Sequence, residues 1–233
     1  MRQLPAARLS TFAIALSFTV ISEPQANFTP IPRAELCVTE GAIAALPGDR
    51  LSVDVPKMRA FVDEPTEQAI QTHFTYVGPT AKRSKLGSGA SRVQFGLKLH
   101  AEDACNLVYA MWRIEPESEL VVSLKSNPGQ HTSSQCTNHG YQNIKPDRSR
   151  PVPTLRPGDS HWMRAQMNGL ELTVFVDDAV VWEGSLPPLV RGLQGSVGVR
   201  SDNAHLNFQL RAAKSPPIPR PSVTCRTGPE ESD

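Results

Sequence analysis

Three consecutive segments in the middle of the chain place polar side chains where they could bind a charged sugar. In residues 93–100, 107–114 and 120–125, apolar residues recur at alternate positions, which is the period of a β-strand with one face in a core. If these strands are neighbours, their other faces form one surface, on which arginine can clamp a carboxylate and tyrosine can stack on a sugar ring. The side chains predicted to line this surface are Gln94, Lys98, His100, Tyr109, Arg113, Lys125 and, after the following loop, Tyr141. The alternative is a solvated sheet face without a ligand.

The sequence pattern shows no pair of catalytic carboxylates. Retaining glycosidases need two carboxyl groups about 5 Å apart. Glu115, Glu117 and Glu119 alternate, but Pro116 interrupts them at a turn between two strands, so we interpret them as a solvated loop. The chain also has no nucleophile-elbow motif and no phosphate-binding glycine loop. These observations favour a binding module over a glucanase-type hydrolase and leave the catalytic residues unassigned.

Metal ligands are sparse in the sequence. His131 and His139 share one loop, but no third ligand stands at a zinc-binding spacing. The turn at Asp202 and Asn203 could offer oxygens to calcium, although calcium prefers six or more of them. We therefore predict no cofactor, with calcium at this turn as a weak alternative.

The N-terminal residues resemble a secretion signal. Arg2 precedes the uncharged, mostly apolar stretch 9–21 and Arg8 adjoins it, while Val20 and Ser22 fit the small-residue cleavage pattern and Ala26 is a later candidate. We therefore predict that residues 1–26 form a signal peptide and that the mature chain is secreted, either extracellular or periplasmic. The full chain has a formal net charge of +1, and removal of two arginines and one glutamate leaves the mature chain neutral. This balance does not favour nucleic acid or an anionic membrane as a partner.

The cysteines are typical of a disulfide-bonded secreted domain. An even number of cysteines in an exported chain indicates disulfides, and these allow three pairings. The spacing favours Cys105 with Cys136, which closes a strand pair over its own loop. It also favours Cys37 with Cys225, which ties together the two ends of the domain. No two cysteines have the C-x-x-C spacing of a zinc site.

Short strands separated by turn signals fill the rest of the chain. The dipeptides Asn168-Gly169 and Asp177-Asp178 each predict a tight hairpin. Further strands are predicted at 51–55, 70–77, 161–167, 170–176, 180–182, 195–199 and 206–210. About ten short strands without sustained helical periodicity indicate a sandwich or a barrel.

The three tryptophans fall into two groups. Trp112 and Trp182 lie within apolar strands and are predicted to be core residues, since aromatic side chains dominate cores. Trp162 has polar neighbours in the sequence and could face a ligand.

The C-terminal half of the chain resembles a known fold family. Residues 170–178 form an alternating apolar strand that ends in Asp177-Asp178, Trp182 follows, and Gly-x-Val-Gly-Val stands at 195–199 before Leu-Asn-Phe at 206–208. This order is similar to that of laminin G-like and concanavalin A-like domains, although Asp178 replaces the usual glycine. The resemblance implies an all-β, two-sheet antiparallel jelly-roll sandwich. This fold hosts lectins, glycosidases, lyases and adhesion modules, so the motif specifies fold better than function.

The predicted organisation is a signal peptide at 1–26, a lead-in strap at 27–48, the sandwich at 49–213 and a proline-rich tail at 214–233. We predict a secreted, lectin-like, non-catalytic module that binds a polysaccharide or another glycan. Gln94, His100, Arg113 and Tyr141 partly match the basic groove of alginate-type lyases of this fold, although the Q-x-H tripeptide of those lyases is absent. A lyase or glycosidase-type enzyme is therefore one alternative, and an adhesion or structural protein without a small ligand is another.

Overall fold

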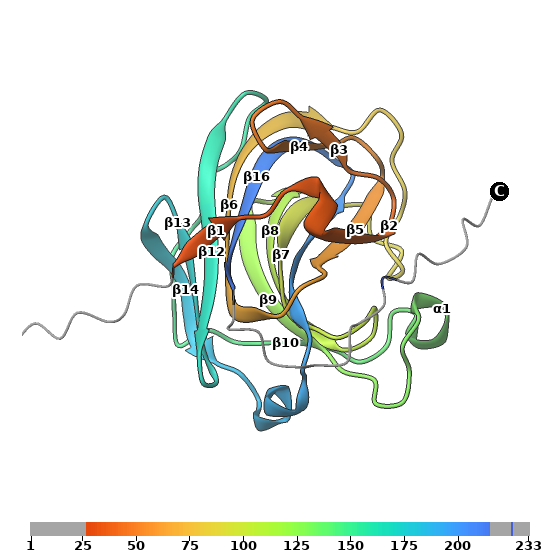
Figure 1. Ribbon diagram of the computed structural model, residues 1–233, viewed down its shortest axis with the longest axis vertical. Helices are drawn as coiled ribbons and strands as arrows, with labels where there is room; N and C mark the ends of the chain where they lie inside the picture. The colour runs from red at the N-terminus through yellow and green to blue at the C-terminus, as the bar shows by residue number, and fades with distance from the viewer. Residues whose placement is uncertain (1–26, 215–224, 226–233) are drawn as a thin grey trace, which may run out of the picture.

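The computed structural model describes residues 27–214 and residue 225, which form two antiparallel β-sheets packed face to face (Figure 1). Sheet A has the order β11 (Arg148–Ser149), β14 (Ala179–Ser185), β13 (Glu171–Val176), β12 (Ser160–Asn168), β6 (Thr66–Pro79), β16 (Ala204–Lys214), β4 (Arg50–Val53), β3 (Ala44–Leu46), and β1 (Phe28–Pro30) also pairs with β16. Sheet B has the order β10 (Tyr141–Asn143), β9 (Glu119–Lys125), β8 (Leu107–Glu115), β7 (Val93–Ala101), β15 (Ser196–Asp202), β5 (Lys57–Val62), β2 (Leu36–Glu40). The predicted two-sheet antiparallel sandwich is confirmed.

Within residues 27–214, helical structure is confined to short connections. These are the 3-10 helices η1 (Arg33–Glu35) and η2 (Pro188–Gly192) and the single α-helical turn α1 (Ser133–Cys136). None of the helices in the described part of the chain is long and apolar enough to span a membrane.

Some strands carry no clear signal in the sequence. Residues 27–48, interpreted above as a lead-in strap, contribute β1, β2 and β3 to the two sheets. Strands β1 and β3 have three residues each and are too short to show alternation. Strand β5 is also missed, because Phe61 is apolar on the outer face and masks the alternation of Met58, Ala60 and Val62. The predicted signal peptide and the proline-rich tail lie outside the described residues, apart from Lys214 and Cys225.

The two predicted hairpins are present, one of them with its turn shifted by a residue. Strands β12 and β13 are joined by Gly169 and Leu170, because Asn168 still belongs to β12. Gly169 has φ of 62°, which a type II′ turn requires at its first central position. Strands β13 and β14 are joined by Asp177 and Asp178, with φ of 48° and 63°, and two positive φ values are typical of a type I′ turn.

The hydrophobic core lies between the sheets and is centred on aromatic rings. The ring centroid of Phe74 lies 5.4 Å from that of Phe95 and, edge-on, 5.6 Å from that of Trp112. Trp112 and Trp182 are both fully buried, which confirms their predicted core positions. Since side chains alternate along a strand, this core forces the remaining residues of β7, β8 and β9 onto the outer face of sheet B.

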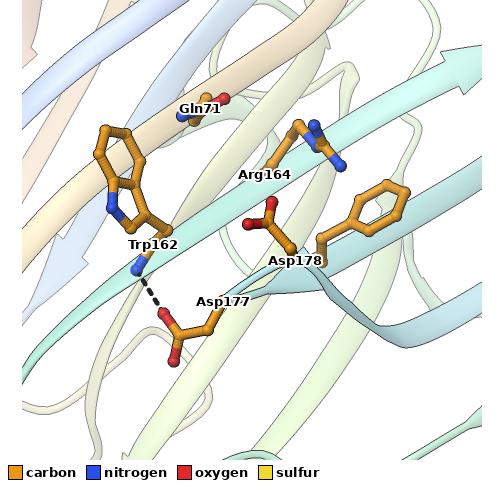
Figure 2. Close-up of a pocket in the computed structure, with 6 residues that line it drawn as sticks. Gln71, Trp162, Arg164, Asp177 and Asp178 are labelled. Atoms are coloured by element: carbon orange, nitrogen blue, oxygen red, sulfur yellow. Dashed lines mark hydrogen bonds between the residues drawn. The ribbon is translucent and has the colours of Figure 1, made fainter.

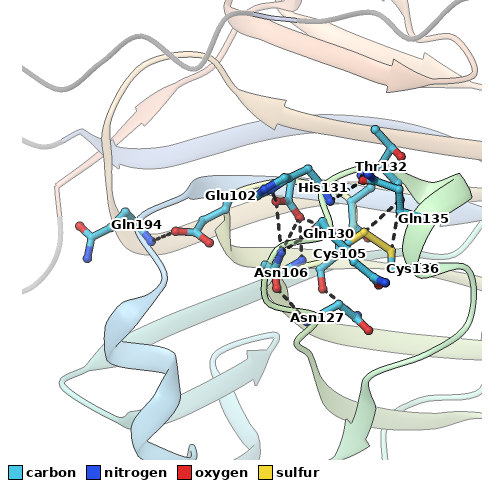
Figure 3. Close-up of polar contacts among 12 residues, drawn as sticks. Glu102, Cys105, Asn106, Asn127, Gln130, His131, Thr132, Gln135, Cys136 and Gln194 are labelled. Carbon is cyan, nitrogen blue, oxygen red and sulfur yellow. Dashed lines mark hydrogen bonds and ion pairs between the residues drawn. A yellow bond between two sulfur atoms is a disulfide. The ribbon is translucent and has the colours of Figure 1, made fainter.

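Both predicted disulfides are present, and one of them fixes a long loop beside sheet B. Cys105, in the β7–β8 turn, is bonded to Cys136 of α1, and Cys37 of β2 is bonded to Cys225. Figure 3 shows the polar contacts around the first disulfide, where the side chain of Asn106 donates to the main-chain carbonyl of Gln130 at 2.8 Å. This loop leads into β10, so its anchoring also sets the position of that edge strand.

Candidate functional site

The register of sheet B places most of the predicted ligand residues side by side. Lys98 on β7 is directly opposite Tyr109 on β8, and Lys125 on β9 is directly opposite Tyr141 on β10. Strands β7, β8 and β9 are neighbours, as predicted, and their intervening residues belong to the core. The outer face of sheet B therefore holds Gln94, Lys98, Tyr109, Arg113, Lys125 and Tyr141.

A fully buried aspartate organises the centre of this face. The carboxylate of Asp202 accepts hydrogen bonds from Arg59 Nη2 at 2.6 Å, from Arg200 Nε at 2.8 Å and from Gln94 Nε2 at 2.6 Å. Burial alone would raise the pKa of Asp202, but the two guanidinium groups and the Gln94 hydrogen bond lower it to about 2. Burial likewise opposes the charge of Arg200, yet Asp202 keeps the pKa of that guanidinium above its usual value. Asp202 and Arg200 are therefore both charged at neutral pH.

Arg200 connects this ion-pair network to two stacked tyrosines. Its guanidinium carbon lies 4.8 Å from the ring centroid of Tyr109, and its Nη1 donates to the hydroxyl of Tyr141 at 3.2 Å. The two tyrosine rings stack with their centroids 6.2 Å apart, and Lys125 Nζ lies 5.1 Å from the Tyr141 centroid. Cation–π attraction holds such cations against the rings. Tyr141 is 38% exposed, so a ligand can reach its ring.

Lys98 is a buried cation on this face without an ion-pair partner among the described residues. It is 4% exposed, and its Nζ lies 3.4 Å from the main-chain carbonyl oxygen of Ala60 on β5. To reach β5 the side chain must cross β15, where the residue opposite is Gly198, which has no side chain to block it. Burial, reinforced by repulsion from Arg59 and Arg200, lowers the pKa of Lys98 to about 7. A bound anion would therefore favour the protonated form.

Lys125 and Arg113 already have protein partners, with different consequences. Lys125 Nζ donates to the carbonyl oxygens of Ala104 and Thr137, both at 3.0 Å, and burial lowers its pKa. These contacts fix the disulfide-bonded loop, so Lys125 supports the face rather than reaching a ligand. Arg113 pairs with Glu119 near the rim and keeps part of its side chain exposed. Its guanidinium can exchange this partner for a ligand carboxylate.

His100 departs from the predicted surface. Its φ of 47° lies in the left-handed region and changes the side-chain direction at the end of β7. Its Nδ1 lies 2.9 Å from the carbonyl oxygen of Leu193, and its main-chain N–H donates to Gln68 Oε1 at 2.6 Å. These residues line a separate pocket of about 270 Å³. The assignment of His100 to the shared face is therefore corrected, since alternation cannot reveal one positive φ.

Arg59 and Arg200 belong to this face but are not identified from the sequence. Arg59 meets Asp202 across 143 residues of chain, a separation that no local pattern can reveal. At the turn considered for calcium, both carboxylate oxygens of Asp202 accept side-chain hydrogen bonds, and Asn203 Oδ1 accepts one from the main chain of Ser84 at 2.8 Å. Among the described residues, no group of three or more His, Cys, Asp or Glu side chains could hold a metal ion.

Comparison with solved structures places this geometry in a known architecture. The carbohydrate-binding module CBM66 from Bacillus subtilis has a TM-score of 0.51 and 13% sequence identity, over 75% of this chain and 91% of the module. The chain has the concanavalin A-like fold. The Emp46p carbohydrate recognition domain is also similar, with a TM-score of 0.45 and 12% identity over 78% of this chain and 90% of that domain. No known protein-family profile matches the sequence, and no curated protein sequence is significantly similar to it.

Within this concanavalin A-like fold, the outer face of sheet B has positively charged groups held in place at its centre and partly exposed side chains at its edge. Asp202 holds the guanidinium groups of Arg59 and Arg200 in place, while Tyr141 and Arg113 expose atoms to solvent. Such an arrangement offers donors and positive charge to carboxylate or sulfate groups and an aromatic face to a sugar ring.

Proposed function

We propose that the protein is a secreted, non-catalytic module that binds an anionic polysaccharide on the outer face of sheet B. The observation that carries this proposal is the convergence of cations around stacked tyrosines: Arg59, Lys98, Arg113, Lys125 and Arg200 lie on one face with Tyr109 and Tyr141. The concanavalin A-like fold and the disulfides are compatible with an extracellular glycan-binding role. Secretion can be tested separately by N-terminal sequencing of exported protein, which we expect to start near residue 27.

Affinity electrophoresis in gels that contain a uronate polymer tests the binding function. We expect retardation in polyuronate and in sulfated polysaccharide, none in a neutral glucan, and weaker retardation as salt screens the charges. Tyr141→Ala removes the exposed ring, and Arg113→Gln removes the rim charge, so each should weaken binding about tenfold, equivalent to about 1.4 kcal/mol. A folded sample that binds no anionic polysaccharide at low salt would refute the proposal.

Arg148→Gln provides the matched control for Arg113→Gln. Arg148 is also an arginine paired with a glutamate near the surface, but it lies on β11 of sheet A. We expect this variant to bind polyuronate like the unmodified protein. Equal losses in both arginine variants would indicate non-specific charge attraction instead of a site on sheet B.

A polysaccharide lyase is the second candidate, because Tyr141 is partly exposed beside Arg200. A tyrosine near arginine is suited to proton abstraction from a uronate bound by its carboxylate. Ultraviolet absorbance of unsaturated sugar, followed during incubation with polyuronate, distinguishes the two candidates. A steady rise that Tyr141→Phe abolishes would establish the lyase, whereas binding without such a rise supports the non-catalytic module.

A further inference from the structure

A separate pocket lies on the outer face of sheet A, on the opposite side of the sandwich. Its volume is about 120 Å³, and the side chains that form it come from three adjacent strands and the β13–β14 turn (Figure 2). The lining residues are Gln71, Trp162, Arg164, Phe175, Asp177 and Asp178. Pockets that enclose drug-sized ligands measure about 300 Å³ or more, so this shallow site is suited to a single ring that stays partly exposed.

Trp162 provides the wall of this pocket that can stack on a ligand. It is 36% exposed, unlike Trp112 and Trp182, which are buried in the core. Its main-chain N–H donates to Asp177 Oδ1 at 2.9 Å, and its ring lies 4.7 Å from the ring of His73 between centroids. The indole is therefore positioned by its neighbours while one part of it faces solvent. A flat, partly exposed indole presents an apolar surface for the C–H face of a sugar.

The polar side chains of the pocket have unused hydrogen-bonding capacity. Arg164 stacks its guanidinium 4.0 Å from the centroid of the Phe175 ring, and its buried Nε has no hydrogen-bond partner. Among the described residues, no hydrogen bond or ion pair involves the carboxylate of Asp178, which Figure 2 shows between Arg164 and the turn. Gln71, directly opposite Arg164 in the sheet, adds an amide that can donate and accept.

The turn that carries Asp178 is held in a defined conformation. Asp177 and Asp178 both have positive φ, and the Asp177 carboxylate also lies 2.6 Å from Nδ1 of His161. Aspartate tolerates this backbone region better than most residues with side chains. The Asp178 carboxylate is thus set at the pocket before a ligand arrives, which lowers the entropic cost of binding.

We infer that this pocket is a second carbohydrate-binding subsite, which takes one neutral sugar ring. The ring stacks on Trp162 while neighbouring hydroxyls accept from Arg164 and donate to Asp178. Hydroxyl groups both donate and accept, so they satisfy a cation and an anion that lie side by side. The opposite charges of Arg164 and Asp178 disfavour a charged sugar here, in contrast to the cationic face of sheet B. The subsite does not depend on the function proposed for that face.

Nuclear magnetic resonance of the indole N–H groups tests the subsite directly. The three tryptophans give three indole signals, and only Trp162 is exposed. Titration with a panel of neutral methyl hexopyranosides and pentopyranosides should shift the Trp162 signal and leave those of Trp112 and Trp182 in place. Asp178→Asn should weaken the binding of the active sugar at least about tenfold. No shift with any of these sugars, up to their solubility limits, would overturn the inference.

Matched variants separate this subsite from the sheet B site. Trp162→Ala should abolish sugar binding measured by the perturbation of main-chain amide signals, whereas Leu189→Ala, at another exposed apolar residue, should not. Tyr141→Ala should weaken polyuronate binding and leave the Trp162 shift unchanged. If polyuronate fails to bind while the Trp162 signal still moves, the proposed function is wrong and the subsite stands. If Tyr141→Ala removes the Trp162 shift, the subsite is overturned.

Discussion

Replacement of Lys98 by methionine should stabilise the protein at neutral and mildly acidic pH. Lys98 is buried, and its Nζ makes only a long contact with the Ala60 carbonyl oxygen within the described residues. Its pKa falls from 10.5 to about 7. Each pKa unit corresponds to about 1.4 kcal/mol, so keeping the charged form buried costs about 5 kcal/mol below pH 7. Methionine has a similar length and no charge, so Lys98→Met removes this cost.

The sign of the pH dependence follows from proton binding in the two states. Between pH 7 and about 10.5, the unfolded chain keeps a proton on Lys98 that the folded protein has released. The free energy of unfolding therefore rises with pH across this window, by about 2 kcal/mol between pH 7 and pH 9 from this residue alone, because the folded protein is only half deprotonated at pH 7. Lys98→Met should lack that rise. Below pH 7 Lys98 is protonated in both states and adds no further slope.

Urea unfolding at pH 6, 7 and 9, followed by tryptophan fluorescence, measures both effects. Lys125→Met is the matched comparison, because Lys125 is equally buried but donates to two carbonyl oxygens at 3.0 Å. Loss of those charged hydrogen bonds should destabilise the protein by about 2 to 4 kcal/mol. The reasoning is refuted if Lys98→Met is less stable than the unmodified protein at pH 6, or if both methionine variants shift stability in the same direction.

Three further variants test the ion pairs around Asp202, the disulfide between Cys105 and Cys136, and the close packing at Gly198 in sheet B. Asp202→Asn should reduce the urea-measured stability at pH 7 by about 3 to 5 kcal/mol, because it removes the buried carboxylate that pairs with two guanidinium groups and leaves Arg59 only its longer contact with Glu40. In the unmodified protein, the Asp202 contribution is present above about pH 4 and is lost as pH falls towards 2, so acid unfolding should begin in that range. Cys105→Ser combined with Cys136→Ser removes a disulfide of sequence separation 31 and should lower the free energy of unfolding by about 4 kcal/mol. Peptide mapping of the unreduced protein that joined Cys105 to Cys37 or Cys225 would contradict the structure. Gly198→Ala would place a β-carbon 2.3 Å from a carbonyl oxygen and should destabilise by about 1 to 3 kcal/mol in thermal melts, whereas Gly192→Ala, which meets no atom within 4 Å, should be neutral.

Local patterns in the sequence predict those parts of the fold that depend on alternation and turn chemistry. The apolar residues at alternate positions of β7, β8 and β9 are sufficient to orient Lys98 and Tyr109 outward. The pairing of Cys105 with Cys136 follows from loop spacing. Strands of three residues such as β1 and β3 are not predictable in this way, because they are shorter than two periods of alternation.

The centre of the candidate site is harder to predict, because it depends on contacts between distant segments. Arg59 comes from β5, whose outer face carries the apolar Phe61, and it meets Asp202 only after β5 and β15 have paired. His100 shows the opposite case, since its alternation is regular and a single positive φ removes it from the face. Neither the long-range pairing nor the backbone reversal leaves a local trace in residue types.

The buried charges of sheet B explain how the outer face of this sheet can hold the candidate site in a defined geometry. An arginine free in solvent must lose its rotational freedom when it binds a ligand, and that loss weakens binding. Here Asp202 has already fixed Arg200, and Arg200 in turn donates to Tyr141, so the exposed ring is positioned by a chain of contacts that begins in a fully buried carboxylate. Lys98 is the exception in this network, because its charge is uncompensated until an anion comes near. The same burial that makes Lys98 unfavourable for stability also means that an anion bound near it would favour its protonated form.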